Sequence, residues 1–527
     1  MAACGGPVPP RDTTGRRALG SLFRAALLRK HVEGRKHGMD GIVERHSPSL
    51  DELEKVARHD LARLNYPPAN WVPEKNGPDG KPVLDVLIVG AGMCGQTVGW
   101  GLLREGIRNI RVIERNRHGQ EGPWNTTARM PTLRSPKHLT GPDLGVPSLT
   151  FRAWYEAQHG AEGWEKLYKI PRLDWLSYLL WVRKVVDLKV ENGVSLLKVE
   201  AASDFLQARL STGETIFVRK IVLANGRDGS GGFRWPSFPS FAPGHPARAG
   251  RVYHTLEEID FAALKGKRLG ILGVLATAID NACTALEAGA REAICYARRP
   301  HLPQVNKSKG VSFPGFQRGQ GMLDDDWRWK IYTYMLAAGS PPPHESVLRA
   351  QRLPGFAFRF AEPWLDMIVD KDGVTVKTAK TTERFDAVLI GTGFDIDLAR
   401  RPELQSFAAN VTLWGDRRAQ AEASANAEAA RYPYLGPGFE LIEKVPGRTP
   451  YMADIHLFNW GSILSHGALA GDIPGLFVGS TRLVQSISHA LFRDDVETHV
   501  QNMYAQEDPE LAPTDYFVPR DRRSGTL

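Results

Sequence analysis

Short apolar runs that end at glycines divide the chain, and the first clear one begins at Asp85. The run from Val86 to Val89 is typical of a buried parallel strand. It leads through a glycine-rich turn into an Ala-, Leu- and Gly-rich stretch that indicates a helix, and a second apolar segment, NIRVIE, then ends at Glu114. The pattern therefore predicts a strand, a tight turn, a helix and a second strand, in that order.

The turn carries three glycines, Gly90, Gly92 and Gly95, at G-x-G-x-x-G spacing. Gly90 permits the tight turn, Gly92 lets a pyrophosphate approach the helix N-terminus, and Gly95 lets the helix and strand pack closely. Glu114 follows Gly95 by 19 residues, where a carboxylate holds a pair of ribose hydroxyls. This stretch therefore predicts a dinucleotide-binding site.

The same plan occurs a second time further along the chain. Alternating segments at 194–210 and 215–220 predict a β-meander, which the buried strand KIVLANG closes at Gly226. A second strand, turn and helix begin at KGKRLGILGVLATA, REAICYARR supplies the next strand, and a hairpin leads to an apolar strand ending at Gly391 and Gly393. We therefore predict an α/β fold with two Rossmann-like dinucleotide-binding domains.

The last part of the chain is expected to return to the first domain. The segment GDIPGLFVGSTRL predicts a final short strand before a helix that begins at about Gln485. Because this strand would complete the first domain, we expect the second domain to be inserted in the first.

The second turn lacks one glycine. Gly273 takes the first position and Leu275 the second, and Ala278 takes the third, where alanine is acceptable for packing. A leucine puts a branched side chain where the pyrophosphate approaches, which lifts the phosphates away or blocks them. Arg298 and Arg299 follow Gly273 by 25 and 26 residues, and arginine at that place suits a 2′-phosphate.

The net charge of +8 is concentrated near the N-terminus. Residues 1–38 hold eight Lys and Arg against two Asp and Glu, so the remainder of the chain is nearly neutral. No base-reading motif accompanies this basic arm, so we predict no nucleic-acid partner. We expect the arm to be disordered, or the start codon to have been assigned too early, with Met39 as the first residue.

The four cysteines, Cys4, Cys94, Cys283 and Cys295, show no metal-binding spacing and no C-x-x-C pair. We therefore predict no metal site and a reducing, cytoplasmic location. No apolar run approaches the roughly 18 residues that a membrane span requires, so we expect no stable membrane insertion.

From about residue 80 to 500 the sequence resembles the class B flavin-dependent monooxygenases, which include flavin-containing monooxygenases, Baeyer-Villiger monooxygenases and ornithine and lysine N-hydroxylases. The resemblance implies that the first site binds FAD and the second binds NADPH. EGPWN resembles the family's G-G-x-W turn beside the isoalloxazine, and VLANG and LIGTGF resemble its two A-T-G linkers. The implied cofactor-binding residues are Gly90, Gly92, Gly95, Glu114, Trp124 and Asn125 for FAD, Gly273, Ala278, Arg298 and Arg299 for NADPH, and Gly393 in the second linker.

Two further stretches carry the resemblance in part. Gly250 and His254 match the family fingerprint F-x-G-x-x-x-H, although Arg248 replaces its phenylalanine. The segments TLRSP and IPRLDWLSYLLW resemble those of the N-hydroxylases, but an aromatic helix that packs a core explains the second equally well.

The resemblance implies candidate catalytic residues. Arg129, Lys137 or His254 would supply positive charge or a hydrogen bond to the flavin peroxide or its substrate. The plain alternatives are surface cations for Arg129 and Lys137 and a structural ring for His254.

The implied function is an FAD-dependent, NADPH-consuming monooxygenase. It would insert one oxygen atom from O2 into a small soluble substrate through a C4a-(hydro)peroxyflavin, by N-hydroxylation or a Baeyer-Villiger type oxygenation. Leu275 keeps two alternatives open: a flavin oxidase or dehydrogenase whose substrate reduces FAD directly, with a degenerate second domain, or a flavoprotein without turnover. The substrate and the oligomeric state stay open, a homo-oligomer included.

The resemblance and the repeat together give the expected domains. These are a partly disordered N-terminal arm at 1–78, the first part of the FAD-binding domain at 79–240, an NADPH-binding domain at 241–384, and the completion of the FAD-binding domain with a substrate-covering C-terminal region at 385–527.

Overall fold

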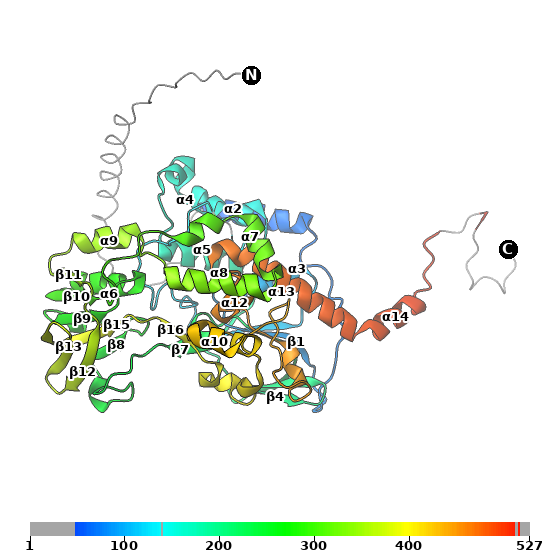
Figure 1. Ribbon diagram of the computed structural model, residues 1–527. Coiled ribbons are helices and arrows are strands. Elements are labelled where there is room, and N and C mark those ends of the chain that lie inside the picture. The colour runs from blue at the N-terminus through cyan, green and yellow to red at the C-terminus, as the bar shows by residue number, and fades with distance from the viewer. Residues whose placement is uncertain (1–47, 139–140, 512–514, 517–527) are drawn as a thin grey trace, which may run out of the picture. The chain divides into compact units, whose positions relative to one another are not determined.

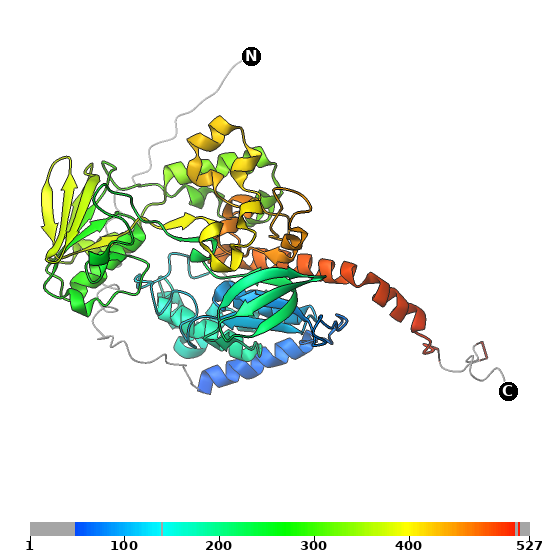
Figure 2. The same ribbon diagram turned by 90° about the horizontal axis from the view of Figure 1, so that it is seen from below.

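The computed structural model describes residues 48–138, 141–511 and 515–516. The expectation for the basic arm at residues 1–38 therefore lies outside the described residues. The first described helix, α2 (Pro48–Arg63), packs against α4 (Phe151–Lys166) and α5 (Arg172–Val185), as Figure 2 shows.

The first sheet has the order β3-β2-β1-β6-β5-β4, with β17 paired to β6. Strands β1, β2 and β6 are parallel, whereas β5 is antiparallel to β6. The last segment of the expected meander and the strand expected to close it are one continuous strand, β6. This strand pairs with β5 on one edge and with β1 on the other. The strands are β1 (Leu84–Val89), β2 (Ile110–Glu114), β3 (Glu191–Asn192), β4 (Leu196–Ala202), β5 (Phe205–Leu210), β6 (Thr215–Leu223) and β17 (Ile455–His456).

The second sheet has the order β11-β10-β9-β15-β8, and all of its pairings are parallel. Figure 1 shows α6 and α9 beside it. Strands β13 and β14 form the expected hairpin, and β12 extends it to a three-stranded antiparallel sheet. The strand β15 of this five-stranded sheet lies just beyond residue 384, the expected end of the NADPH-binding domain. The elements are β8 (Val252–His254), β9 (Arg268–Leu272), α6 (Ala276–Glu287), β10 (Glu292–Tyr296), α9 (His344–Gln351), β11 (Phe356–Arg359), β12 (Trp364–Asp370), β13 (Gly373–Thr378), β14 (Thr382–Phe385) and β15 (Ala387–Ile390).

The chain returns from the second sheet to the first through two short strands. β16 (Phe394–Ile396) pairs with β7 (Gly231–Phe233), which is the segment that leaves the first sheet. β17 then joins the first sheet beside β6, and α13 (Ile473–Asp494) packs on α3 (Met93–Arg104). The connection supports a second domain inserted in the first.

The prediction of a strand before Gln485 is wrong, because α13 is helical throughout its 22 residues. The apolar stretch GLFV looked like a short buried strand. The buried positions of α13 recur every three or four residues, which is the period of one helix face. They include Ile473, Leu476, Ser480, Leu483, Ile487 and Leu491.

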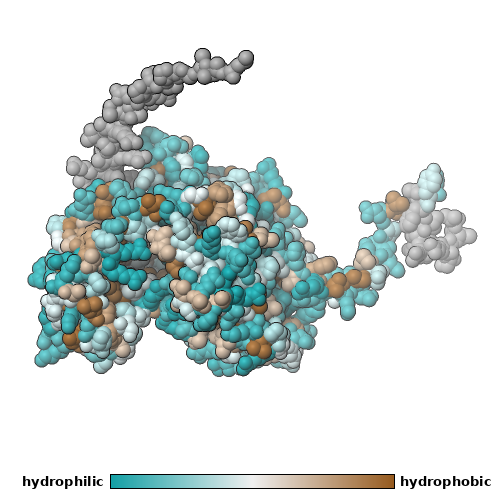
Figure 3. Space-filling model, in the orientation of Figure 1, coloured by the Kyte–Doolittle hydropathy of each residue, from teal (hydrophilic) through white to brown (hydrophobic). Residues whose placement is uncertain are grey.

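The remaining helices lie after the first meander and toward the C-terminus. Trp175 and Tyr178 of α5 are buried in an aromatic core, as the alternative for that helix required. α14 contains no buried residue and exposes Met503 and Tyr504, and Figure 3 shows hydrophobic residues along it. None of the helices in the described ranges combines the length and hydropathy needed to cross a membrane. These helices are α7 (Pro314–Gly319), α8 (Asp325–Ala338), α10 (Gln420–Ala425), α11 (Ala427–Ala430), α12 (Ile463–His466) and α14 (Val496–Ala505).

A buried ion-pair network fixes the end of α13 to the first sheet. The carboxylate of Asp495, fully buried, lies 2.7 Å from Arg219 of β6 and 2.8 Å from Lys75. Burial raises the pKa of Asp495, but the hydrogen bonds from Lys75 and Arg219 outweigh it, so the pKa lies below its usual value. The network therefore stabilises the fold only while Asp495 is ionised.

We expect Asp495→Asn to lower the free energy of unfolding by about 3 kcal/mol near neutral pH, because it leaves the buried guanidinium of Arg219 without its closest carboxylate. The folded-state pKa of Asp495 is depressed, so its contribution is present above the ordinary pKa of a carboxyl group and is lost as the pH falls through the folded value. Urea unfolding at several pH values measures both effects. The matched control is Asp494→Asn, since Asp494 is 38% exposed and its partner Lys220 keeps Asp454. A cost equal to that of the control would contradict the prediction.

Candidate functional site

The first glycine turn joins the carboxyl end of β1 to the N-terminus of α3. Gly90 has φ +97°, and a Cβ atom there would stand 2.7 Å from the Ala224 carbonyl oxygen. A Cβ on Gly95 would stand 1.8 Å from the Gly90 carbonyl oxygen, whereas one on Gly92 would meet only Gly122, at 3.7 Å. The protein itself therefore requires Gly90 and Gly95, while Gly92 leaves the helix N-terminus open to a ligand.

Glu114 ends β2 beside this turn and is buried. Its Oε2 accepts a hydrogen bond of 2.9 Å from the Ala91 amide, and its Oε1 accepts one of 2.9 Å from the Asn116 amide. The carboxylate is thus held in place next to the glycine turn, where the nucleotide ribose would lie.

Trp124 and Asn125 follow Gly122, which faces Gly92. Trp124 is buried and packs edge-on against Trp175, with ring centroids 6.4 Å apart, whereas Asn125 is exposed. Within the described ranges, neither the indole nitrogen of Trp124 nor Oε1 of Gln96 in α3 has a hydrogen-bond partner. Two orphaned buried polar atoms around an open glycine fit a polar cofactor such as FAD.

The second turn has a backbone geometry similar to that of the first turn at its first two positions. Gly273 has φ +127°, and a Cβ atom there would stand 2.6 Å from the Gly391 carbonyl oxygen. Leu275 occupies the N-cap of α6 with extended backbone, as Gly92 does in α3, and its side chain is 43% exposed. Ala278 is buried against Gly391. The turn is therefore intact, and Leu275 adds a side chain at the position where the first turn is open.

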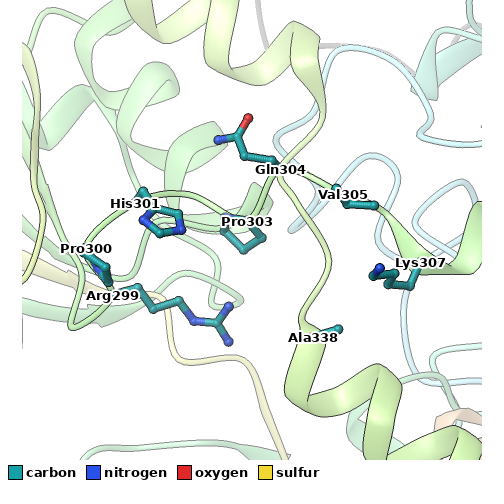
Figure 4. A pocket seen from close by; sticks show the side chains of 8 residues that line it. All are labelled: Arg299, Pro300, His301, Pro303, Gln304, Val305, Lys307 and Ala338. Atoms are coloured by element: carbon teal, nitrogen blue, oxygen red, sulfur yellow. The ribbon is translucent and has the colours of Figure 1, made fainter.

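Arg298 and Arg299 follow the end of β10 but differ in their surroundings. Arg298 is exposed, whereas Arg299 lines a cavity of about 530 Å³ together with His301, Gln304 and Lys307 (Figure 4). In Figure 4 the Arg299 guanidinium points away from the loop that carries His301 and toward Ala338 on the other side of the cavity. Basic groups around one cavity fit an anion such as a 2′-phosphate, and Arg299 has the better position of the two.

Arg129 and Lys137 are held by different parts of the first domain. The Arg129 guanidinium donates to the Thr126 carbonyl and lies 5.1 Å from the Phe261 ring of the second domain. Burial and the neighbouring Arg172 lower its pKa. The Lys137 ammonium donates to the Trp164 carbonyl at the end of α4 and lies 4.7 Å from the Trp164 ring. The structure thus ties Lys137 to α4, and Arg129 to the contact between the domains.

His254 ends β8 and is fully buried. Its ring stacks on Phe233 with centroids 4.7 Å apart and meets the edge of Trp235 at 5.3 Å. Burial lowers its pKa to about 4, so the ring is neutral near pH 7. A role through positive charge therefore has no support, and a hydrogen-bonding role stays a prediction.

Gly393 lies between β15 and β16, where the chain crosses back between the domains. Its φ is +83°, and its carbonyl accepts a hydrogen bond of 2.9 Å from the Arg234 amide. The residue thus forms part of the linker, as the resemblance implied for its position.

Two charged residues near the first turn were missed by the sequence analysis. Arg227 follows β6 closely, and Asp472 is the N-cap of α13. Each influences the pKa of the other, although 245 residues separate them. The position of Arg227 just after the strand-ending Gly226 was the one available signal, because ligands bind at the carboxyl ends of parallel strands.

We expect Gly92→Ala to weaken FAD binding at least about tenfold while leaving the fold intact, because its Cβ meets no protein atom closer than 3.7 Å. Gly95→Ala is the matched control. It should destabilise the fold by about 1–3 kcal/mol, since its Cβ would overlap the Gly90 carbonyl. FAD titration by fluorescence and urea unfolding separate the two effects. Equal losses of stability in both variants would contradict the assignment of Gly92 to the ligand.

We expect Leu275→Gly to tighten NADPH binding about fivefold or more. The substitution removes a side chain whose steric overlap with the pyrophosphate at the helix N-terminus costs about 1 kcal/mol of binding free energy. The dissociation constant of NADPH from the oxidised protein measures this, with Leu275→Ala as an intermediate. An unchanged or weaker affinity in Leu275→Gly would mean that the cofactor does not use this turn.

Comparisons with known proteins agree with this geometry. An FAD-NAD(P)-binding family model matches residues 87–228. The chain is 40% identical over 465 residues to the FAD-dependent urate hydroxylase of Xanthomonas campestris pv. campestris, covering 88% of this chain and 97% of that protein.

The fold is also similar to that of two solved bacterial enzymes. Ornithine hydroxylase from Pseudomonas aeruginosa is similar with a TM-score of 0.58 at 16% identity, over 78% of this chain and 100% of that one. L-lysine 6-monooxygenase from Pseudomonas syringae is similar with a TM-score of 0.58 at 14% identity, over 77% and 99%. With two dinucleotide-binding turns and a close relative along nearly its whole length, the chain belongs to the class B flavin-dependent monooxygenases, which use FAD and NADPH.

Proposed function

We propose that this monooxygenase hydroxylates urate or a planar nitrogen heterocycle of the same class. The observation that carries the proposal is the 40% identity to a urate hydroxylase over almost the full length of both chains. Hydroxylation is accordingly favoured over a Baeyer-Villiger type oxygenation, which acts on ketones. The substrate is a small molecule and the co-substrate is O2.

The first turn would hold FAD. Bound FAD supplies the redox chemistry, accepting a hydride from NADPH and transferring one atom of O2 to the substrate. The amides at the N-terminus of α3, left open by Gly92, would bind the pyrophosphate, and Glu114 would bind the ribose. The buried indole of Trp124 would form an apolar wall with a free donor, which helps to exclude water.

The second turn would hold NADPH in a modified way. Arg299, with His301 and Lys307 around the same cavity, would bind the 2′-phosphate. Leu275 would displace the pyrophosphate from the helix N-terminus without removing the site. A degenerate second domain, as in the oxidase alternative, is supported by Leu275 alone, since the turn keeps its backbone geometry.

Arg129 would act where the two domains meet. Its side chain lies over Phe261, and its carbonyl accepts a hydrogen bond of 3.2 Å from Arg349, which lies 3.7 Å from Asp280 of α6. We assign to Arg129 the positioning of the two domains, and to Lys137 the anchoring of its loop on α4. The buried free thiols of Cys94, Cys283 and Cys295 suit a reducing cytoplasm.

The test measures product and flavin separately. With NADPH, O2 and urate, we expect a product that has gained one oxygen atom, with that atom labelled when labelled O2 is supplied. Without O2, NADPH should bleach the flavin absorbance and urate alone should not. The control omits urate and measures uncoupled NADPH oxidation.

Two results would contradict the proposal. If urate alone bleached the flavin, the oxidase alternative would hold. If NADPH bleached the flavin but urate stayed unchanged while another amine, ketone or N-heterocycle gained oxygen, the enzyme would remain a monooxygenase of a different substrate.

A further inference from the structure

Arg227 is a cation without a protein partner beside the cofactor turn. It lies four residues beyond the end of β6, whose Leu223 pairs with Val89 next to Gly90. Among the described residues its guanidinium has no hydrogen bond or ion pair, and it lies 4.4 Å from the centre of the Trp460 ring. The side chain is accessible, yet burial by surrounding protein lowers its pKa. Arg227 is thus an exposed cation that the Trp460 ring holds in place and that has no hydrogen-bond or ion-pair partner in the described part of the chain.

The loops that carry Arg227 and Trp460 are locked together. The Asn459 side chain donates to Oδ1 of Asn225 at 2.9 Å and accepts hydrogen bonds from the Ser230 hydroxyl and the Gly461 amide. This network surrounds the two residues in sequence, so the guanidinium and the indole are positioned before a ligand arrives. Such preorganisation lowers the cost of binding.

Asp472 supplies an acceptor near this cation. Gly471, its neighbour, lies against the Trp460 ring, where its Cβ would stand 3.8 Å from a ring carbon. Within the described ranges Asp472 forms no ion pair, although it and Arg227 influence each other's pKa. It also influences Cys94 of α3, directly after the Gly90–Gly92 turn. Asp472 therefore lies next to a residue that meets the Trp460 ring, on which Arg227 packs, and at the start of α13, which packs on α3.

A guanidinium and a carboxylate that are close but not paired offer donors and an acceptor to one ligand. A lactam edge, with a C=O beside an N–H, presents the complementary pattern. Urate carries such edges on a planar ring and is an anion at neutral pH. Binding would give the exposed guanidinium of Arg227 and the half-buried carboxylate of Asp472 charge-assisted hydrogen bonds.

We propose that Arg227 and Asp472 are the specificity-determining pair of the active site: Arg227 donates to the anionic oxygen edge of an oxopurine, and Asp472 accepts from its ring N–H. This inference rests on the proposed function. It assigns the recognition of the substrate, rather than of FAD or NADPH, to these two side chains.

The experiment uses the FAD-loaded enzyme with urate as the probe. We expect Arg227→Gln to raise the dissociation constant of urate, followed by perturbation of the oxidised flavin spectrum, by about 10- to 100-fold. Arg227→Lys keeps the positive charge without the planar guanidinium and its paired donors, so its affinity for urate should fall less. Asp472→Leu should lose as much as Arg227→Gln, and Asp472→Asn, which keeps an acceptor, should lose less. FAD content and the rate of flavin reduction by NADPH should be unchanged.

The control is Arg493→Gln, since Arg493 is 80% exposed at the end of α13. Wild-type affinity for urate in Arg227→Gln would overturn the inference while leaving the proposed function intact. Loss of FAD, or slow flavin reduction by NADPH, would assign Arg227 to a cofactor and also overturn it. A wild-type enzyme that reduces its flavin with NADPH but neither binds nor hydroxylates urate would refute the proposed function itself.

Discussion

The close approach of a helix N-terminus to the carboxyl end of a strand is the constraint on which the two domains depend. In the first domain Gly95 passes the Gly90 carbonyl so closely that a Cβ atom would stand 1.8 Å from its oxygen. In the second domain Ala278 fits because Gly391, directly after the neighbouring strand β15, has no side chain; a Cβ atom there would stand 2.8 Å from the Ala278 Cβ. Both solutions place helix amides at the same edge of a parallel sheet, which is where a dinucleotide phosphate binds.

This constraint separates two kinds of glycine within one motif. The protein itself requires Gly90, which has a positive φ, and Gly95, which has no room for a Cβ atom. Gly92 has an ordinary φ and enough space for a Cβ atom. The second turn keeps a glycine at position 273, where the fold requires one. It has Leu275 at the position where only a ligand would require a glycine. Such a pattern preserves the fold while altering how a phosphate is held, and the basic cavity around Arg299 offers a second point of attachment.

Local features of the fold could be predicted from the sequence because strands, tight turns and helices leave their period in nearby residues. The two repeats and the inserted connection follow from such features. The strand expected before Gln485 failed because a short apolar run has the same composition in a strand and in the buried face of α13. The proximity of Arg227 to Asp472 could not be predicted, since only tertiary packing brings the loop after β6 near the start of α13.

Charge is informative in this protein where it lacks a partner. Other arginines near the sheets are paired, as Arg111 is with Glu191 and Glu214 and Arg268 with Glu292 and Glu383. An exposed arginine that the chain holds on an aromatic ring, without a carboxylate partner among the described residues, can offer its donors to a ligand from outside the chain. By that argument Arg227, beside the flavin turn and fixed on Trp460, is a stronger indicator of substrate chemistry than the more numerous cations of the surface.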